Sequence, residues 1–233
     1  MTPAHPGLTL PEELLLLALD PQRGKPYCRN RFLEYGMAGA VLAELELQGR
    51  ITEQLGRIRV INPLTPQDPL LAQVLGSLPA PDTGRFTGGV SAKRWIRRTG
   101  RHVEELCLDH LVDRAVLRRE TRRFLGLLPY HRHPAAAPDL PAAVRERFTA
   151  ARTAGFPDPR GRTLAALVSA IGLSGAVAQG GWRARSAMRD LVRQEWTAHA
   201  VHQNVRQDKA NRSGGSAGGS GGGSGGGSSG DGD

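Results

Sequence analysis

Aromatic residues are scarce in this 233-residue chain, which has three Trp, three Tyr and five Phe. Surfaces that bind single-stranded nucleic acid by stacking its bases interleave aromatic with basic side chains, and no such pattern is present. Cysteine is also scarce, since Cys28 and Cys107 are the two in the chain. Two cysteines are too few for a disulfide framework at this length, so we expect free, buried thiols.

Long apolar runs are absent as well. The longest apolar stretch, residues 164–178, is interrupted by Ser and Gly and is shorter than the roughly 20 residues that a membrane span needs. The first apolar run, residues 14–19, follows two glutamates instead of the basic segment of an export signal. We therefore expect a cytoplasmic protein without a transmembrane helix.

Motifs of common enzyme classes are missing. The sequence has no phosphate-binding loop, dinucleotide fingerprint or His-Glu-x-x-His pattern. Residues 214–218 match Gly-x-Ser-x-Gly, but they lie in a Gly/Ser stretch that lacks the strand–turn–helix this chemistry needs. His131 and His133 have no third metal ligand nearby in the sequence. We expect no enzyme activity, cofactor or metal site.

Lysine is rare too, so nearly all the positive charge is arginine. The net charge is +9, and residues 213–233 contribute −2 through two Asp, so the rest of the chain carries +11. Abundant Arg and Ala indicate a GC-rich bacterial gene. The guanidinium group forms a rigid fork that suits phosphate. This charge favours nucleic acid, anionic lipid or an acidic protein as the partner, without choosing between them.

Hydrophobic periodicity predicts a mainly α fold, a single helical domain of about eight helices with two small β-hairpins. Residues 1–7 are expected to be a flexible N-terminus, 8–205 the domain and 206–233 a disordered Gly/Ser-rich tail. Gly36 and Gly39 within one predicted helix favour the close approach of another helix. Helices are expected near residues 10–19, 32–48, 69–78, 91–114, 142–154, 161–178 and 181–201, and hairpins at 50–61 and 116–128.

The segment 91–114 carries the clearest functional signal. Arg94, Arg97, Arg98 and Arg101 follow i, i+3, i+4, i+7 spacing, which places four guanidinium groups on one stripe of a continuous helix. Such a stripe offers several donors to phosphate oxygens. The alternative is an ordinary solvated helix face. A break near residues 99–100 would divide the stripe.

Arg29 and Arg31 add to this signal. They precede the predicted helix 32–48, so that its N-terminal N–H groups could also face an anion.

Four segments resemble the Golgi phosphoprotein 3 family. They are residues 10–19 (LPEELLLLAL), 35–51 (YGMAGAVLAELELQGRI), 111–117 (LVDRAVL) and 157–160 (PDPR). The resemblance spans about residues 8–205. It implies a helical fold with β-hairpins and a peripheral, non-catalytic protein that binds phosphatidylinositol 4-phosphate on membranes. It also implies contacts with cytoplasmic tails of membrane proteins and weak self-association through a hairpin.

The family's headgroup positions fall on four residues of this chain. Arg101 keeps an arginine of the family pattern, whereas Arg29 stands in place of a tryptophan, and Ala38 and Glu104 in place of arginines. The leading hypothesis is reversible binding to anionic phospholipid at the inner face of the cell membrane. Nucleic-acid binding, supported by charge alone, and a protein-interaction scaffold remain alternatives. The candidate headgroup residues are Arg29, Arg31, Arg97, Arg98 and Arg101.

Overall fold

The computed structural model describes residues 7–79, 89–124, 128–177 and 181–214. Within these ranges the chain is mainly helical, with nine helices, a three-stranded antiparallel sheet β1–β2–β3 and a two-stranded sheet β4–β5. This confirms the predicted fold class. The elements are α1 (Leu10–Ala18), α2 (Asn30–Leu47), β1 (Ile51–Gln54), β2 (Arg57–Val60), α3 (Pro69–Ser77), β3 (Val90–Ser91), α4 (Ala92–Asp113), β4 (Glu120–Phe124), β5 (Leu128–Arg132), α5 (Asp139–Thr153), α6 (Pro159–Ala170), α7 (Ser174–Val177), α8 (Trp182–Gln194) and α9 (Trp196–Gly214).

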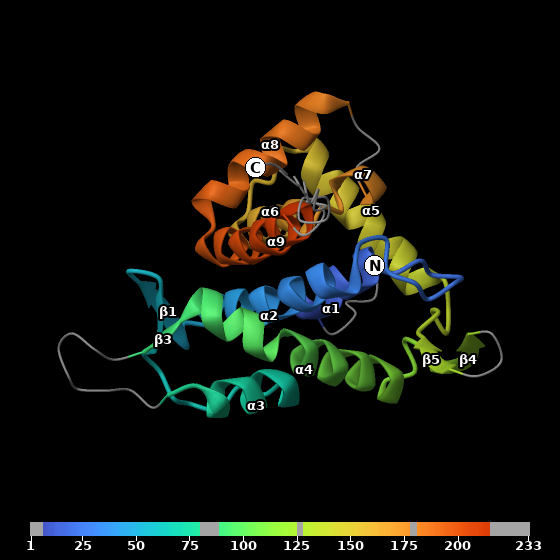
Figure 1. The fold of residues 1–233 in the computed structure, drawn as a ribbon, viewed down its shortest axis with the longest axis horizontal. Helices are drawn as coiled ribbons and strands as arrows, with labels where there is room; N and C mark the ends of the chain where they lie inside the picture. The colour runs from blue at the N-terminus through green and yellow to red at the C-terminus, as the bar shows by residue number, and fades with distance from the viewer. Residues whose placement is uncertain (1–6, 80–88, 125–127, 178–180, 215–233) are drawn as a thin grey trace, which may run out of the picture.

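The helices are stacked in layers around α1 and α2 (Figure 1). On one side of this pair lie α4 and then α3, and on the other lie α6 and α9, with α8 outermost. Most of α2 is buried because it packs against helices on both sides. The two sheets lie at opposite ends of the α4 layer. No described helix is long and apolar enough to cross a membrane.

Glycines allow the close helix crossings. A Cβ atom on Gly39 would lie 2.5 Å from Val201 of α9, and one on Gly36 would lie 2.9 Å from Ile171. The predicted close approach at both glycines is therefore confirmed. Gly100 plays the same part for α4, because a Cβ atom there would lie 2.7 Å from the carbonyl oxygen of Glu34. Helix α4 is continuous through residues 99–100, so the arginine stripe is not divided.

Two buried carboxylates form contacts between the four segments that resemble the Golgi phosphoprotein 3 family. Glu12 of α1 pairs with Arg114 at the end of α4. Glu44 of α2 accepts hydrogen bonds from the Leu10 backbone N–H (2.7 Å) and from Arg160 Nη1 (2.8 Å). Because a buried carboxylate needs hydrogen-bond partners and a counter-charge, these pairs fix how the four segments pack.

The second hairpin was predicted wrongly at residues 116–128. The paired strands are β4 and β5, with Glu120 opposite Arg132, and the connecting residues 125–127 lie outside the described part of the chain. Val116 instead belongs to the turn that ends α4, since its N–H donates to the Leu111 carbonyl oxygen. The prediction centred that hairpin on a turn at Glu120 and Thr121, which are not the Gly or Asn that tight hairpin turns favour.

The C-terminal helices also differ from the prediction. The expected helix 161–178 ends at Ala170, just before Gly172 adopts a positive φ of 82°. The expected helix 181–201 is divided at Glu195, whose backbone is extended and whose carboxylate accepts a hydrogen bond from Thr163 Oγ1. Helix α9 then continues to Gly214. Residues 206–214, expected to begin the tail, are therefore helical, and residues 215–233 lie outside the described ranges.

Candidate anion-binding site

Basic side chains from three helices meet where the N-terminus of α2 approaches α4 and α9. Arg29 is the N-cap residue of α2, so the helix begins slightly earlier than predicted, and its first turn contains no acidic residue and no side-chain cap. An N-terminus of this kind carries partial positive charge and N–H groups suited to an anion. We call Arg29, Arg31, Arg97 and Lys209 the basic cluster.

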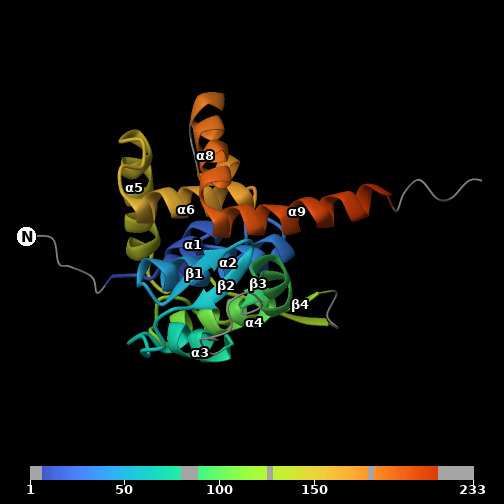
Figure 2. The same cartoon turned by 90° about the vertical axis from the view of Figure 1, so that its left-hand side faces the viewer.

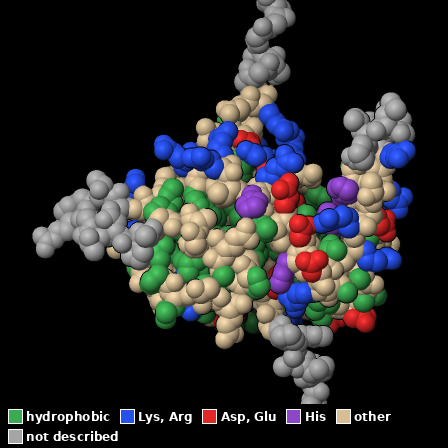
Figure 3. Space-filling model, turned by 90° about the horizontal axis from the view of Figure 1, so that it is seen from below, with side chains coloured by type: hydrophobic (Ala, Val, Ile, Leu, Met, Phe, Trp, Pro, Cys, Tyr) green, Lys and Arg blue, Asp and Glu red, His purple; other side chains and the backbone are tan. Residues whose placement is uncertain are grey.

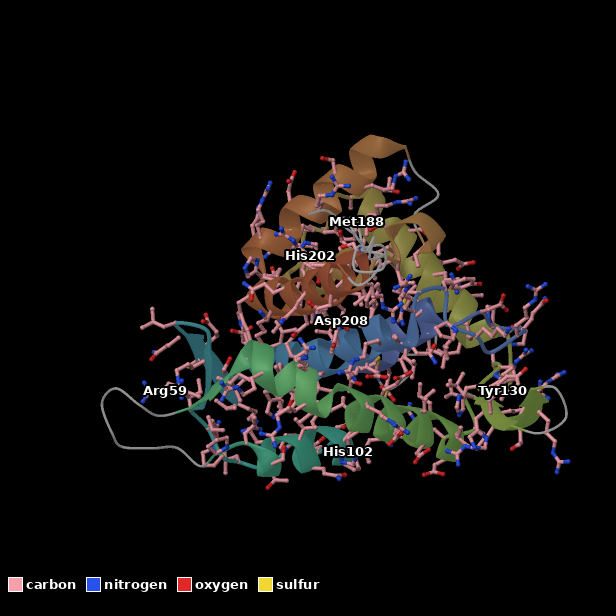
Figure 4. The ribbon with its side chains drawn as sticks, in the orientation of Figure 1. Arg59, His102, Tyr130, Met188, His202 and Asp208 are labelled. Atoms are coloured by element: carbon pink, nitrogen blue, oxygen red, sulfur yellow. The ribbon has the colours of Figure 1, made fainter. Side chains whose placement is uncertain are left out.

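Asp208 of α9, labelled in Figure 4, places its carboxylate beside two members of this cluster, Arg31 of α2 and Arg97 of α4. Its Oδ1 is 3.5 Å from Arg97 Nη2, and its Oδ2 is 3.9 Å from Arg31 Nε. Oδ2 also accepts a hydrogen bond of 2.9 Å from the Tyr35 hydroxyl. Burial, and then the hydrogen bond to Asp208, raises the pKa of Tyr35, so this phenol is protonated and donates at neutral pH.

Arg29 joins the cluster through an aromatic ring. Its guanidinium carbon lies 5.7 Å from the centroid of Phe32, and Lys209 Nζ lies 5.5 Å from the same centroid. Phe32 is otherwise buried, with 7% of its surface exposed, and its ring holds two cations at the protein surface by cation–π attraction.

The five predicted site residues thus separate into two groups. Arg29, Arg31 and Arg97 come together around Phe32, Tyr35 and Asp208. Arg98 is exposed on α4 and forms no ion pair with any described residue. Arg101 points elsewhere, because its Nε donates to Glu105 Oε1 at 2.9 Å.

Arg101 borders a cavity of about 310 Å³ whose charge differs from that of the basic cluster. Three carboxylates and two imidazoles line it as well, so Arg101 is outnumbered by acids. On the face seen in Figure 3, Lys and Arg side chains gather along the upper edge, and acidic, basic and His side chains mix on the right. The charged and imidazole groups of the cavity are Glu34, Arg101, Glu104, Glu105, His131 and His133.

Three of the four headgroup positions implied by the resemblance carry residues other than those of the family pattern. Glu104 lines the cavity beside Arg101, Ala38 is buried within α2, and Arg29 lies against Phe32. Among the described residues, no group of three or more His, Cys, Asp or Glu side chains is placed to hold a metal ion.

Burial raises the pKa of Glu104 to about 8, with further contributions from the negative charges of Glu34 and Glu105. The folded chain therefore keeps this carboxyl protonated over a pH range in which an unfolded glutamate is ionised. Because the folded state binds the extra proton, the free energy of unfolding falls as pH rises from about 4.5 to about 8.

We expect Glu104→Gln to remove the decrease in the free energy of unfolding that the buried carboxyl causes at high pH. The substitution should change stability little at pH 5 and raise the free energy of unfolding by about 1–3 kcal/mol at pH 8.5, a range reduced for partial solvent screening. Urea unfolding at both pH values measures the difference. Glu105→Gln is the control. It removes a smaller, electrostatic contribution to the raised pKa of Glu104 and leaves the burial of Glu104, so it should give a smaller gain at pH 8.5. An equal gain from Glu104→Gln at both pH values would contradict a buried, protonated carboxyl.

Several residues of the site were missed from the sequence. Asp208 and Lys209 were assigned to the tail, so α9 was not expected to reach the arginines. Tyr35 was noted only as the first residue of the segment 35–51 that resembles the family. The signal that could have revealed Asp208 and Lys209 is the charged run that follows residues 196–205. It can continue their helix up to the Gly/Ser stretch.

Comparison with known proteins identifies the family. The family model described as Golgi phosphoprotein 3 (GPP34) matches residues 10–207. Vacuolar protein sorting-associated protein 74 of Schizosaccharomyces pombe is 27% identical over 167 residues, which cover 64% of this chain and 49% of that protein. The protein of the same name from Eremothecium gossypii is 30% identical over 165 residues, covering 62% and 49%. The chain spans about half the length of these curated relatives, and it belongs to the Golgi phosphoprotein 3 family.

Proposed function

We propose that this protein binds reversibly to anionic membrane surfaces through the basic cluster. The observation that supports this most is the convergence of Arg29, Arg31, Arg97 and Lys209 at an uncapped helix N-terminus. Each Lys or Arg near such a surface contributes about 1 kcal/mol. Four of them give attachment of about 4 kcal/mol before the partial neutralisation by Asp208, a weak and reversible association.

We propose that the protein selects negatively charged lipids in general and not one particular headgroup. The family resemblance implies phosphatidylinositol 4-phosphate, but the cavity beside Arg101 places carboxylates where a phosphate would have to bind. In the basic cluster, by contrast, four cations outnumber the two carboxylates of Glu34 and Asp208 that lie against them. Anionic phospholipid at the inner face of the cell membrane is therefore the proposed partner, and the protein has no catalytic step in this function.

An adaptor role for cytoplasmic tails of membrane proteins, and weak self-association, also follow from the family resemblance and remain proposals. The sheet β1–β2–β3 begins just after the C-terminal end of α2, whereas Arg29 lies at the N-terminus of that helix. A molecule bound to a membrane through the α2 N-terminus could present this sheet to a protein partner.

Sedimentation with vesicles tests the proposed function. The protein should sediment with phosphatidylglycerol/phosphatidylcholine vesicles at low salt and should be released at about 0.5 M salt, because screening shortens the range of surface charge. It should stay in solution with neutral phosphatidylcholine vesicles. Equal binding to both vesicle types, or binding to duplex DNA but not to anionic vesicles at low salt, would contradict the proposal.

A further inference from the structure

We infer that Asp208 occupies a discrete anion-binding site formed by Arg31, Tyr35 and Arg97, and that a phosphate group of the membrane binds there in its place. This inference rests on the proposed function and adds a location and a competitor within the chain. The site draws one donor residue from α4 and two from α2, and the carboxylate is supplied by α9.

The donor set suits an oxyanion. Two guanidinium groups and a phenol hydroxyl surround one carboxylate, and such charge-assisted donors also bind phosphate oxygens. Arg31 is held in place from two sides, because its Nε donates to the Tyr35 hydroxyl at 2.9 Å and its Nη1 donates to Glu34 at 2.7 Å. The site is therefore preformed and does not depend on Asp208 for the position of Arg31.

Asp208 fills this site loosely. Its distances of 3.5 Å to Arg97 and 3.9 Å to Arg31 exceed the roughly 2.7–2.9 Å of a charge-assisted hydrogen bond. Both arginine side chains also remain substantially exposed, 42% for Arg31 and 37% for Arg97. Donors of both arginines are thus open to an anion arriving from solvent, which a phosphate with several oxygens can contact more fully than the single carboxylate does.

The helix that carries Asp208 is weakly attached at this end. Val205 is the last buried residue of α9, and the residues after Asp208 are exposed. Figure 2 shows this end of α9 extending beyond the body of the molecule. In the described part of the chain, Asp208 and Lys209 make the ionic and cation–π contacts that hold these last turns. Displacing the carboxylate therefore disturbs little of the core.

Asp208→Asn tests the inference in the full chain. Asparagine keeps an oxygen that accepts from Tyr35, but it removes the competing charge, so binding to phosphatidylglycerol vesicles should become about five-fold tighter (about 1 kcal/mol for one charge). Asp190→Asn is the matched control. It removes the same charge from an ion pair with Arg193 on α8 and should change binding less than two-fold. In an Arg31→Gln, Arg97→Gln background, Asp208→Asn should have no effect.

The outcomes separate the inference from the proposed function. If the unaltered chain binds the vesicles but Asp208→Asn binds no tighter, or if Asp190→Asn gives the same gain, the inference is wrong and the proposed function stands. If neither chain binds, the proposed function fails. Inorganic phosphate distinguishes the source of the anion. If inorganic phosphate releases the protein from vesicles more effectively than chloride at equal ionic strength, a single free phosphate fills the site. If the two salts release it equally, the site binds phosphate only as part of the lipid surface.

Discussion

Replacing Arg160 by leucine is expected to lower the free energy of unfolding by about 3 kcal/mol. Arg160 is the cation beside Glu44, a carboxylate with 8% of its side chain exposed. Breaking a buried pair leaves an uncompensated charge at a cost of roughly 3–5 kcal/mol, and the lower end applies because 35% of the arginine side chain is exposed. Its Nη2 also donates to the Leu8 carbonyl oxygen. Urea unfolding at pH 7 measures the loss.

Two further variants isolate the cause. Arg162→Leu on the same helix removes an arginine whose Nη1 donates to the Pro157 carbonyl oxygen at the protein surface, and it should change stability by less than about 0.5 kcal/mol. Adding Glu44→Gln to Arg160→Leu should restore about half the loss, because glutamine can still accept from the Leu10 N–H without a charge. A loss that persists undiminished in the double variant would contradict the buried-charge explanation.

Reversing two charges of the basic cluster should weaken binding to anionic vesicles by at least about a hundred-fold. In Arg29→Glu, Lys209→Glu, each substitution removes a cation and adds an anion. At about 1 kcal/mol for each charge near the surface, the four charges together approach three orders of magnitude. Both residues are exposed, so the fold should be retained. Vesicle sedimentation at low salt measures the binding, and circular dichroism checks the fold.

The control for this change is Arg185→Glu, Arg189→Glu. These residues are exposed on α8, which rises from the body in a different direction from α9 (Figure 2). The net charge changes equally, so bulk electrostatics would weaken both double variants alike. We expect less than a ten-fold loss for the α8 variant. Equal losses would assign binding to overall charge and not to the basic cluster.

The fold could be predicted where local patterns and packing agree. Residues 35–47 combine apolar periodicity with two glycines, and the structure places a neighbouring chain segment against each glycine. The capping-box pattern at Thr9 and Glu12 starts α1 as its sequence indicates. In both cases the residues that determine the element lie within it or within one turn of it.

Tertiary contacts decided the elements that could not be predicted. No Gly or Pro marks the break between α8 and α9, and the extended residue there, Glu195, bonds to Thr163 from a helix 32 residues earlier. The neighbouring Trp196 donates to Glu46 of α2, 150 residues away. Neither partner can be recognised from the spacing of residues around the break.

In the candidate site, too, local features could be predicted from the sequence and tertiary contacts could not. Helical spacing correctly placed Arg97, Arg98 and Arg101 on one helix, but it could not show that Arg97 meets Asp208 or that Arg101 bonds to Glu105. The contact between Tyr35 and Asp208 joins residues 173 apart. Because that contact brings α9 to the arginines, the grouping of Arg31 with Arg97 depended on tertiary structure.

Position-specific fluorescence on vesicles tests most directly whether the α9 end and the basic cluster face the membrane. An environment-sensitive fluorophore is attached to Asn211→Cys on the last turns of α9 or to Ala187→Cys on α8, after both native cysteines are replaced by alanine. Both positions are exposed. Anionic vesicles should shift the emission of the label at 211 to shorter wavelength and leave the label at 187 unchanged. A shift at 187 with none at 211 would contradict the account.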